Sequence, residues 1–143
     1  MSTAVEVKLY KPYDKQKEVH KVLNDTTTTF ITVKAGRQAG KSLLAMNQAL
    51  FWGLNTPNRI VYWVSPTASQ AVKIYKQLVK PLLYTNLLKS NKGGQGDTEI
   101  VFNNGSIIKF RSAAQEDSLR GESVDYLIVD EAAFVKEEVF QEI

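Results

Sequence analysis

The feature that most limits the fold of this chain is a glycine-rich segment between an apolar run and a helical pattern. The segment covers residues 34–42 and reads Lys-Ala-Gly-Arg-Gln-Ala-Gly-Lys-Ser. The β-branched run at residues 30–33 predicts a strand before it, and apolar residues at helical spacing follow from Leu43 to Phe51. A strand, a glycine-rich loop and a helix in this order are typical of loops that bind phosphate groups. We therefore expect a nucleotide-binding α/β fold.

The end of this loop carries the residue types that phosphate binding needs. Glycines let backbone N–H groups close around phosphate oxygens, Lys41 supplies positive charge, and the Ser42 hydroxyl reaches a magnesium ion. One position departs from the usual spacing, because Ala35 stands where the first glycine is expected and Gly36 follows it. The alternative is a chance Gly-Lys-Ser at the start of a helix, which the flanking strand and helix disfavour.

A second apolar run ends in two acids. Residues 126–129 read Tyr-Leu-Ile-Val and predict a buried strand, and Asp130 and Glu131 follow directly. Acids at the carboxyl end of a buried strand point into the crevice where open α/β sheets bind ligands. There Asp130 suits the shell of a magnesium ion, and Glu131 suits the polarisation of an attacking water. The alternative is the start of a helix, where acidic side chains complement the helix dipole.

Between these motifs, apolar spacing and turn residues predict alternating helices and strands. Helices are expected at 14–24, from Lys41 to a stop at Gly53 and Pro57, and from Thr67 to a kink or end at Pro81, and residues 135–143 are expected to be the start of a further helix. Strands are expected at 59–64, 98–102 and 106–111, the last two as a hairpin around Asn-Gly, with loops at 91–96 and 112–123. This alternation indicates a parallel sheet flanked by helices, with a β-hairpin insertion.

Charge is distributed unevenly along the chain. Residues 1–115 hold 16 Lys and Arg against 6 Asp and Glu, whereas residues 116–143 hold 2 against 9. A basic body suits a polyanionic partner such as a nucleic acid or a nucleotide, and a solvated lysine-rich surface is the alternative. The lysines that are candidates for DNA contact, with two tyrosines near them, are Lys73, Lys76, Lys80, Lys89 and Lys92, with Tyr75 and Tyr84.

Composition excludes several classes of protein. With 143 residues, 43% of them apolar, the chain is long enough for one domain or part of one, with a real core. Cysteine is absent, which excludes disulfides, thiolate metal sites and cysteine nucleophiles, and His20 is the only histidine, which excludes a metal site built from several histidines. We expect His20 on the surface. No apolar run approaches the roughly 18 residues of a membrane span, and no secretory signal is recognisable.

Three segments, in order, carry a family resemblance. They are Gly36–Ser42 with Arg-Gln before Gly-Lys, Arg59–Thr67 followed by Gln70-Ala71, and Ser118–Gly121 followed by Asp125–Ala133. Together they resemble the N-terminal ATPase domain of phage large terminases, the motors that package DNA into capsids. The resemblance spans about residues 10–140, and the combination of motifs is more specific than any one of them.

The resemblance implies a role for each matched residue. Arg37 would touch the γ-phosphate or act as a sensor, and Gln16 lies where the family reads adenine, an exposed helix glutamine being the alternative. Arg120, eleven residues before Glu131, would be the arginine finger received by a neighbouring subunit, with a loop salt bridge as the alternative. The implied nucleotide contacts are Gln16, Gly36, Arg37, Gln38, Ala39, Gly40, Lys41 and Ser42. The implied metal ligands are Ser42 and Asp130, and the implied catalytic residues are Glu131, Arg120 and Arg37.

The resemblance also implies a fold and a function. The fold would be a P-loop NTPase of the additional-strand catalytic-glutamate type, with residues 1–143 as the N-terminal part of the ATPase domain and the nuclease domain absent. In the family, the strand after the acidic motif lies between the phosphate-loop strand and the acidic-motif strand. We therefore expect a sheet that is incomplete at the C-terminus. The function would be Mg²⁺-dependent ATP hydrolysis that drives viral double-stranded DNA into a capsid.

The implied partners are double-stranded DNA, a portal protein, a small terminase subunit and identical subunits in a ring, with no membrane. The implied location is the cytoplasm of the infected bacterial host, at the procapsid portal, without secretion. Two alternatives remain open. A superfamily 2 helicase-like translocase would carry His or Asp where this chain has Ala133, and a nucleotide-binding module would lack hydrolysis.

Overall fold

The computed structural model describes residues 14–25, 40–93, 98–114 and 123–131. The chain forms two compact units, Met1–Gln48 and Ala49–Ile143. The helices are α1 (Asp14–Leu23), α2 (Lys41–Asn55) and α3 (Ala68–Val79), followed by the short 3₁₀ helix η1 (Lys80–Leu82). The strands are β1 (Ile60–Ser65), β2 (Leu88–Lys92), β3 (Thr98–Phe102), β4 (Ile107–Ser112) and β5 (Tyr126–Val129). None of the described helices has the length and apolar character that a bilayer crossing requires.

In the first unit, one buried amide, from Gln48 in the middle of α2, contacts residues of α1 and its C-terminal end. The Gln48 side chain is buried, and its Oε1 accepts a hydrogen bond from His20 Nδ1 at 2.6 Å. Gln48 Nε2 donates to Asn24 Oδ1 at 2.7 Å. Both ends of the amide are therefore satisfied, as a buried polar group requires. His20 was expected on the surface, and this holds only in part, because the residue is half-buried and bonds to Gln48.

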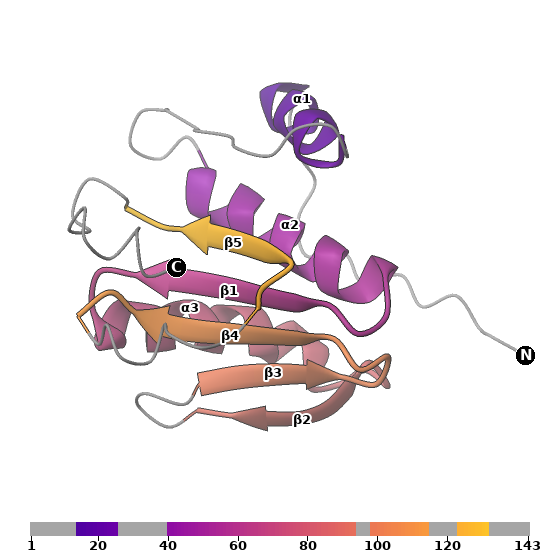
Figure 1. Ribbon diagram of the computed structural model, residues 1–143, viewed down its shortest axis with the longest axis vertical. Helices are drawn as coiled ribbons and strands as arrows, with labels where there is room; N and C mark the ends of the chain where they lie inside the picture. Colours follow the sequence, from indigo (N-terminus) through magenta and orange to yellow (C-terminus); the bar gives the residue numbers. More distant parts are fainter. Residues whose placement is uncertain (1–13, 26–39, 94–97, 115–122, 132–143) are drawn as a thin grey trace, which may run out of the picture. The chain divides into compact units, whose positions relative to one another are not determined.

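In the second unit, the described strands form one sheet in the order β2-β3-β4-β1-β5. Figure 1 shows the arrows of β1, β4 and β5 running in one direction, and the pairing of β1 with both neighbours is parallel. Strand β3 is antiparallel to β4 and to β2. The sheet is thus mixed, which corrects the expected parallel sheet. The hairpin is part of the sheet rather than an insertion, because β4 pairs directly with β1 along its whole length.

Strand β1 forms the centre of the core. Residues 61–65 are all buried, and the Trp63 and Tyr62 rings are among the largest fully buried side chains. A near-continuous apolar run is what a strand covered on both faces needs, so this prediction is confirmed. Helix α3 packs against β1, β3 and β4 and lies behind the sheet in Figure 1.

Helix α3 begins and ends at the residues that the sequence indicates. The Thr67 side chain accepts a hydrogen bond from Gln70 N, and the Gln70 side chain accepts one from Thr67 N, which forms a reciprocal capping box. At the other end, Pro81 removes a backbone donor, so the α-helix stops at Val79 and one 3₁₀ turn follows.

The hairpin turn holds the end of α2 against the sheet. Gly105 has φ +87°, and a Cβ there would lie 2.2 Å from Asn58 Oδ1, so the turn needs glycine. Asn104 Nδ2 donates to the Gly53 carbonyl at 2.8 Å, which satisfies a carbonyl near the helix end. Gly53 was expected to end the helix, and this was wrong. It lies inside α2, where a Cβ would lie 2.8 Å from the Phe102 ring.

The two outer strands of the described sheet differ from expectation. Residues 91 and 92 were expected in a loop but belong to β2, whose residues after Leu88 are all exposed. Strand β5 was expected to be buried, yet its residues are half-buried and Leu127 is 38% exposed. Among the described residues, β5 pairs with β1 alone.

Candidate functional site

The acidic pair lies at the carboxyl edge of the sheet in the second unit. Val64 and Val129 are register partners in the parallel pair of β1 and β5, and Asp130 N donates to the Val64 carbonyl at 2.9 Å. Both strands therefore end together. The chain leaves β1 through Ser65 toward the start of α3, and it leaves β5 through Asp130 and Glu131. This is the edge where open α/β sheets bind ligands.

Glu131 is fixed by its backbone and by a neighbouring side chain. Its φ is +50°, a left-handed value that non-glycine residues adopt rarely. Its Oε2 accepts a hydrogen bond from Gln70 Nε2 at 2.8 Å, from the first turn of α3. The other carboxylate oxygen has no hydrogen-bond partner among the described residues. Glu131 is exposed, so this second oxygen is accessible to water.

Asp130 fits the chemistry of a magnesium ligand. Its side chain is half-buried at the sheet edge, and a carboxylate oxygen is the donor that Mg²⁺ prefers. Within the described part of the chain, no three His, Asp or Glu side chains form a group that could hold a metal. A single carboxylate nevertheless suits Mg²⁺, which usually keeps several waters and binds through one or two carboxylates and substrate phosphates.

In the first unit, α2 begins at Lys41, as the sequence predicts. Gly40 precedes it with φ +80°, a conformation that glycine adopts without steric cost. Lys41 and Ser42 are exposed, and the first backbone N–H groups of the helix have no partner within the helix. A helix start with an exposed lysine and hydroxyl is suited to an anion.

Gln16 lies at this helix start rather than on an exposed surface. Its side chain is only 4% exposed, and its Nε2 donates to the Gly40 carbonyl at 3.2 Å. The alternative of an exposed helix glutamine was wrong. The sequence did not indicate this contact, because Gln16 and Gly40 are 24 residues apart.

Several residues singled out from the sequence lie outside the described residues. They are Gly36, Arg37, Gln38, Ala39, Arg120 and Ala133, with the strand expected at 30–33 and the helix expected within 135–143. Their roles remain predictions.

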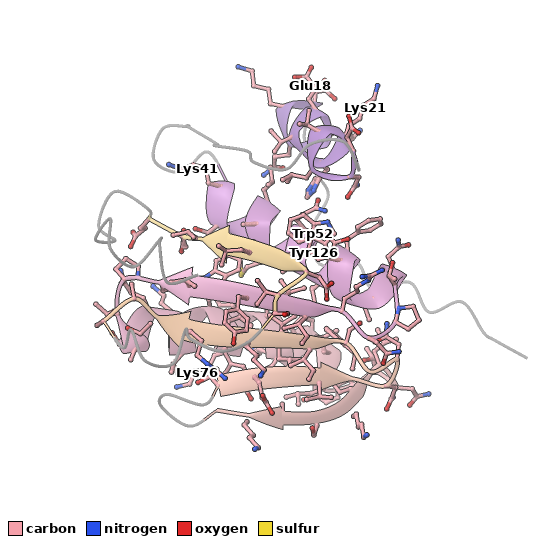
Figure 2. The ribbon with its side chains drawn as sticks, viewed as in Figure 1. Glu18, Lys21, Lys41, Trp52, Lys76 and Tyr126 are labelled. Carbon is pink, nitrogen blue, oxygen red and sulfur yellow. The ribbon has the colours of Figure 1, made fainter. Side chains whose placement is uncertain are left out.

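Two lysines of α3 and the first residue of η1 are exposed, as the spacing of a solvated helix face indicated. Lys73, Lys76 and Lys80 are exposed, and Lys76 is labelled in Figure 2. Tyr75 does not join them, because its ring is buried against Phe110 in an edge-to-face contact with a centroid separation of 5.7 Å. Its hydroxyl donates to Asn91 Oδ1 at 2.8 Å, and burial raises the pKa of Tyr75 above the ordinary value of 10.0. Tyr84 is 92% exposed.

Comparison with known families decides the relationship. The family model of the N-terminal region of T4-type terminase large subunits matches residues 33–142. The chain belongs to the terminase large-subunit family. The resemblance drawn from the motifs is thereby confirmed. The terminase large subunit of Escherichia phage T5 is 36% identical over 122 residues, which cover 85% of this chain and 27% of that protein.

Solved terminase structures have the same fold. The ATPase domain of the large terminase of Thermus phage P74-26 matches with a TM-score of 0.64 and 23% identity, over 93% of this chain and 58% of that one. A mutant of that domain, in which one arginine is replaced by alanine, matches with a TM-score of 0.67 and 23% identity over the same shares of both chains. The chain spans about a quarter of the length of the phage T5 terminase.

Proposed function

We propose that this chain binds Mg-ATP and hydrolyses it by in-line attack of water, as the ATPase part of a motor that moves viral double-stranded DNA into a capsid. The observation that carries the proposal is Glu131, at the carboxyl edge of β1 and β5, with one oxygen held by Gln70 and the other open to water. A fixed carboxylate with one open oxygen is what a general base for water requires. Family membership supports the motor role.

Each remaining group has a proposed role. Lys41 and Ser42 would bind phosphate oxygens at the start of α2, where the first backbone N–H groups have no partner within the helix. Ser42 and Asp130 are each a proposed ligand of Mg²⁺, which would supply charge stabilisation on the transferring phosphoryl group. Gln16, Gly36, Gln38, Ala39 and Gly40 would contact the nucleotide. Arg37 and Arg120 remain the proposed sensor and the arginine finger, and the partners proposed are DNA, portal protein, small terminase subunit and identical subunits in a ring.

The test of hydrolysis is Mg-ATP turnover per chain as a function of protein concentration, with the Glu131→Gln variant alongside. We expect the variant to bind ATP and to lose about 10²- to 10⁴-fold in turnover, the usual contribution of a general base. Glu18→Gln is the matched control, because Glu18 is an exposed acid on α1. Turnover that rises with concentration would support subunits that complete one another's sites. Equal turnover in Glu131→Gln would remove the base assignment.

The test of the phosphate loop is nucleotide affinity. Lys41→Ala should weaken ATP binding by about 10- to 100-fold, because it removes a charge-assisted hydrogen bond to phosphate. Lys76→Ala, an exposed lysine on α3, should leave affinity unchanged. Unchanged affinity in Lys41→Ala would contradict the loop assignment. ATP binding without turnover would favour the non-hydrolysing nucleotide-binding module.

A further inference from the structure

The Gln70 amide is held at both ends. Its Oε1 accepts a hydrogen bond from Thr67 N at 3.2 Å and one from Thr67 Oγ1 at 2.9 Å. Its Nε2 donates to Glu131 Oε2 at 2.8 Å. The backbone N–H of Thr67 can only donate and a carboxylate can only accept, so these partners fix which end of the amide faces Glu131. The orientation of this side chain is thus determined by the helix cap.

The Thr67 cap and the Glu131 carboxylate lie at the same edge of the sheet, next to a buried strand. Strand β1 is buried, Pro66 follows it, and Thr67 starts α3 at the same sheet edge where β5 ends. Glu131 itself adopts φ +50°, which directs its side chain differently from a regular strand or helix residue. Left-handed backbone in a non-glycine residue persists where the surroundings hold it and is frequent at functional sites. Two independent features, a backbone conformation and a hydrogen bond, therefore fix one carboxylate.

We propose that Gln70 is a positioning residue for the hydrolysis reaction: it holds Oε2 of Glu131 so that Oε1 faces the attacking water. The inference rests on the proposed role of Glu131 as general base. Gln70 itself touches neither water nor nucleotide in this proposal. It limits the rotation of the carboxylate, and misplacement of a reacting group by about 1 Å can cost about 100-fold in rate.

The discriminating variant is Gln70→Glu. Glutamate at this position of a capping box still accepts from the Thr67 N–H, so α3 keeps its cap. It lacks the N–H donor and places a second carboxylate beside Glu131, so the positioning contact is lost. Gln77→Ala is the matched control, since Gln77 is an exposed glutamine of the same helix. Thermal unfolding of both variants should remain close to that of the parent chain.

Steady-state kinetics separate positioning from a structural role. In Gln70→Glu we expect kcat for Mg-ATP to fall by about 10- to 100-fold with KM changed less than about 2-fold, because the contact serves the transition state and not ground-state binding. Gln77→Ala should keep both constants. If Gln70→Glu has the same kcat as the parent chain, the inference is overturned. It is also overturned if kcat falls only in proportion to the amount of folded protein that is lost.

The same experiment separates this inference from the proposed function. If Glu131→Gln abolishes turnover and Gln70→Glu leaves kcat unchanged, the base assignment stands and the positioning role fails. If Glu131→Gln leaves turnover unchanged, the base assignment fails first. A spectroscopic measurement applies even to a chain without turnover: the side-chain amide signals of Gln70 should shift in Glu131→Ala and stay in Glu18→Gln. An unshifted Gln70 signal in Glu131→Ala would overturn the contact and the inference together.

Discussion

The two outer strands of the described sheet, β2 and β5, differ in how well their sequences suit an exposed sheet edge. Strand β2 has the sequence Leu-Lys-Ser-Asn-Lys, and its residues after Leu88 are exposed. Strand β5 reads Tyr-Leu-Ile-Val and carries no charge. Lysines on an edge strand oppose pairing with another chain, whereas an apolar edge favours it. β2 is therefore composed for contact with water, and β5 has the composition of an interior strand.

The anchors of the two strands also differ. At β2, the Tyr75 hydroxyl donates a hydrogen bond to Asn91 Oδ1 at 2.8 Å. At β5, Trp52 stacks on Tyr126 with ring centroids 4.3 Å apart and an interplanar angle of 4°. Both residues are labelled in Figure 2. At the start of β5, Asp125 Oδ2 accepts from Ile60 N at 2.8 Å and Oδ1 accepts from Arg59 at 3.2 Å. The strand that leads into the candidate catalytic acids is thus held by an aromatic stack and by a carboxylate that accepts two hydrogen bonds.

Removal of the aromatic stack should give the largest effect. Trp52→Ala is expected to lower the free energy of unfolding by about 2 kcal/mol, less than the roughly 3–5 kcal/mol of a fully buried ring, because Trp52 is half-buried. Urea unfolding measures this. Amide exchange should accelerate at Leu127 and not at Ser90 of β2. Trp52→Phe is the control and should keep most of the stability. Equal acceleration in both strands would remove the difference between the two edges.

The carboxylate at the start of β5 should give the second effect. Asp125→Ala leaves the Ile60 N–H and the Arg59 guanidinium without their acceptor, which should cost about 1–2 kcal/mol. Asp125→Asn retains one acceptor oxygen for Ile60 N–H and should cost less. Urea unfolding of the pair gives both values. If Asn91→Ala in β2 costs as much as Asp125→Ala, then β5 is not the more strongly anchored strand.

The sequence predicted the features that have local signals and missed those that depend on contacts between distant residues. The β1 run, the Thr67 cap and the Asn-Gly turn were predicted because their signals are local. Strand β2 was missed because Leu-Lys-Ser-Asn-Lys has neither β-branched residues nor apolar alternation, and pairing with β3 determines it.

The burial of β5 was overestimated because an apolar run does not reveal what covers it. For the site, the sequence placed Glu131 and Lys41 correctly at the ends of their elements. The bonds of Gln16 to Gly40 and of Gln70 to Glu131 join residues 24 and 61 positions apart, so no local pattern could indicate them.

Alkaline pH should affect the β2 anchor in particular. Burial raises the pKa of Tyr75 above 10.0, so the folded chain keeps the phenol neutral while the unfolded chain ionises it near 10.0. The Tyr75 contribution is complete below pH 10.0 and is lost as pH rises through 10.0 toward the folded pKa, by at most about 1.4 kcal/mol per pH unit. Urea unfolding between about pH 8 and 11 should show this loss, and Tyr75→Phe should reduce it. Tyr84→Phe, at an exposed ring, is the control.

The smallest expected effect on stability is at the exposed leucine of β5. Leu127→Lys should change the free energy of unfolding by less than about 0.5 kcal/mol, since Leu127 is 38% exposed. It should nevertheless lower self-association, because a lysine on an apolar edge opposes strand pairing. Sedimentation at several concentrations measures this, with Lys89→Leu in β2 expected to raise association. No change in either variant would contradict the contrast between the two edges.

At Glu131, the left-handed backbone favours glycine, whereas the proposed hydrolysis reaction requires an acid. At φ +50° a glycine carries no steric penalty, whereas other residues lose roughly 1–2 kcal/mol. Glu131→Gly would remove one exposed hydrogen bond and also relieve that steric penalty. Without selection for hydrolysis, we therefore expect glycine to accumulate at this position. A lineage that keeps glutamate at this position keeps it against the preference of its own backbone. In laboratory evolution under selection for stability alone, the fraction of variants that keep glutamate at position 131 would measure how strongly the backbone disfavours this residue.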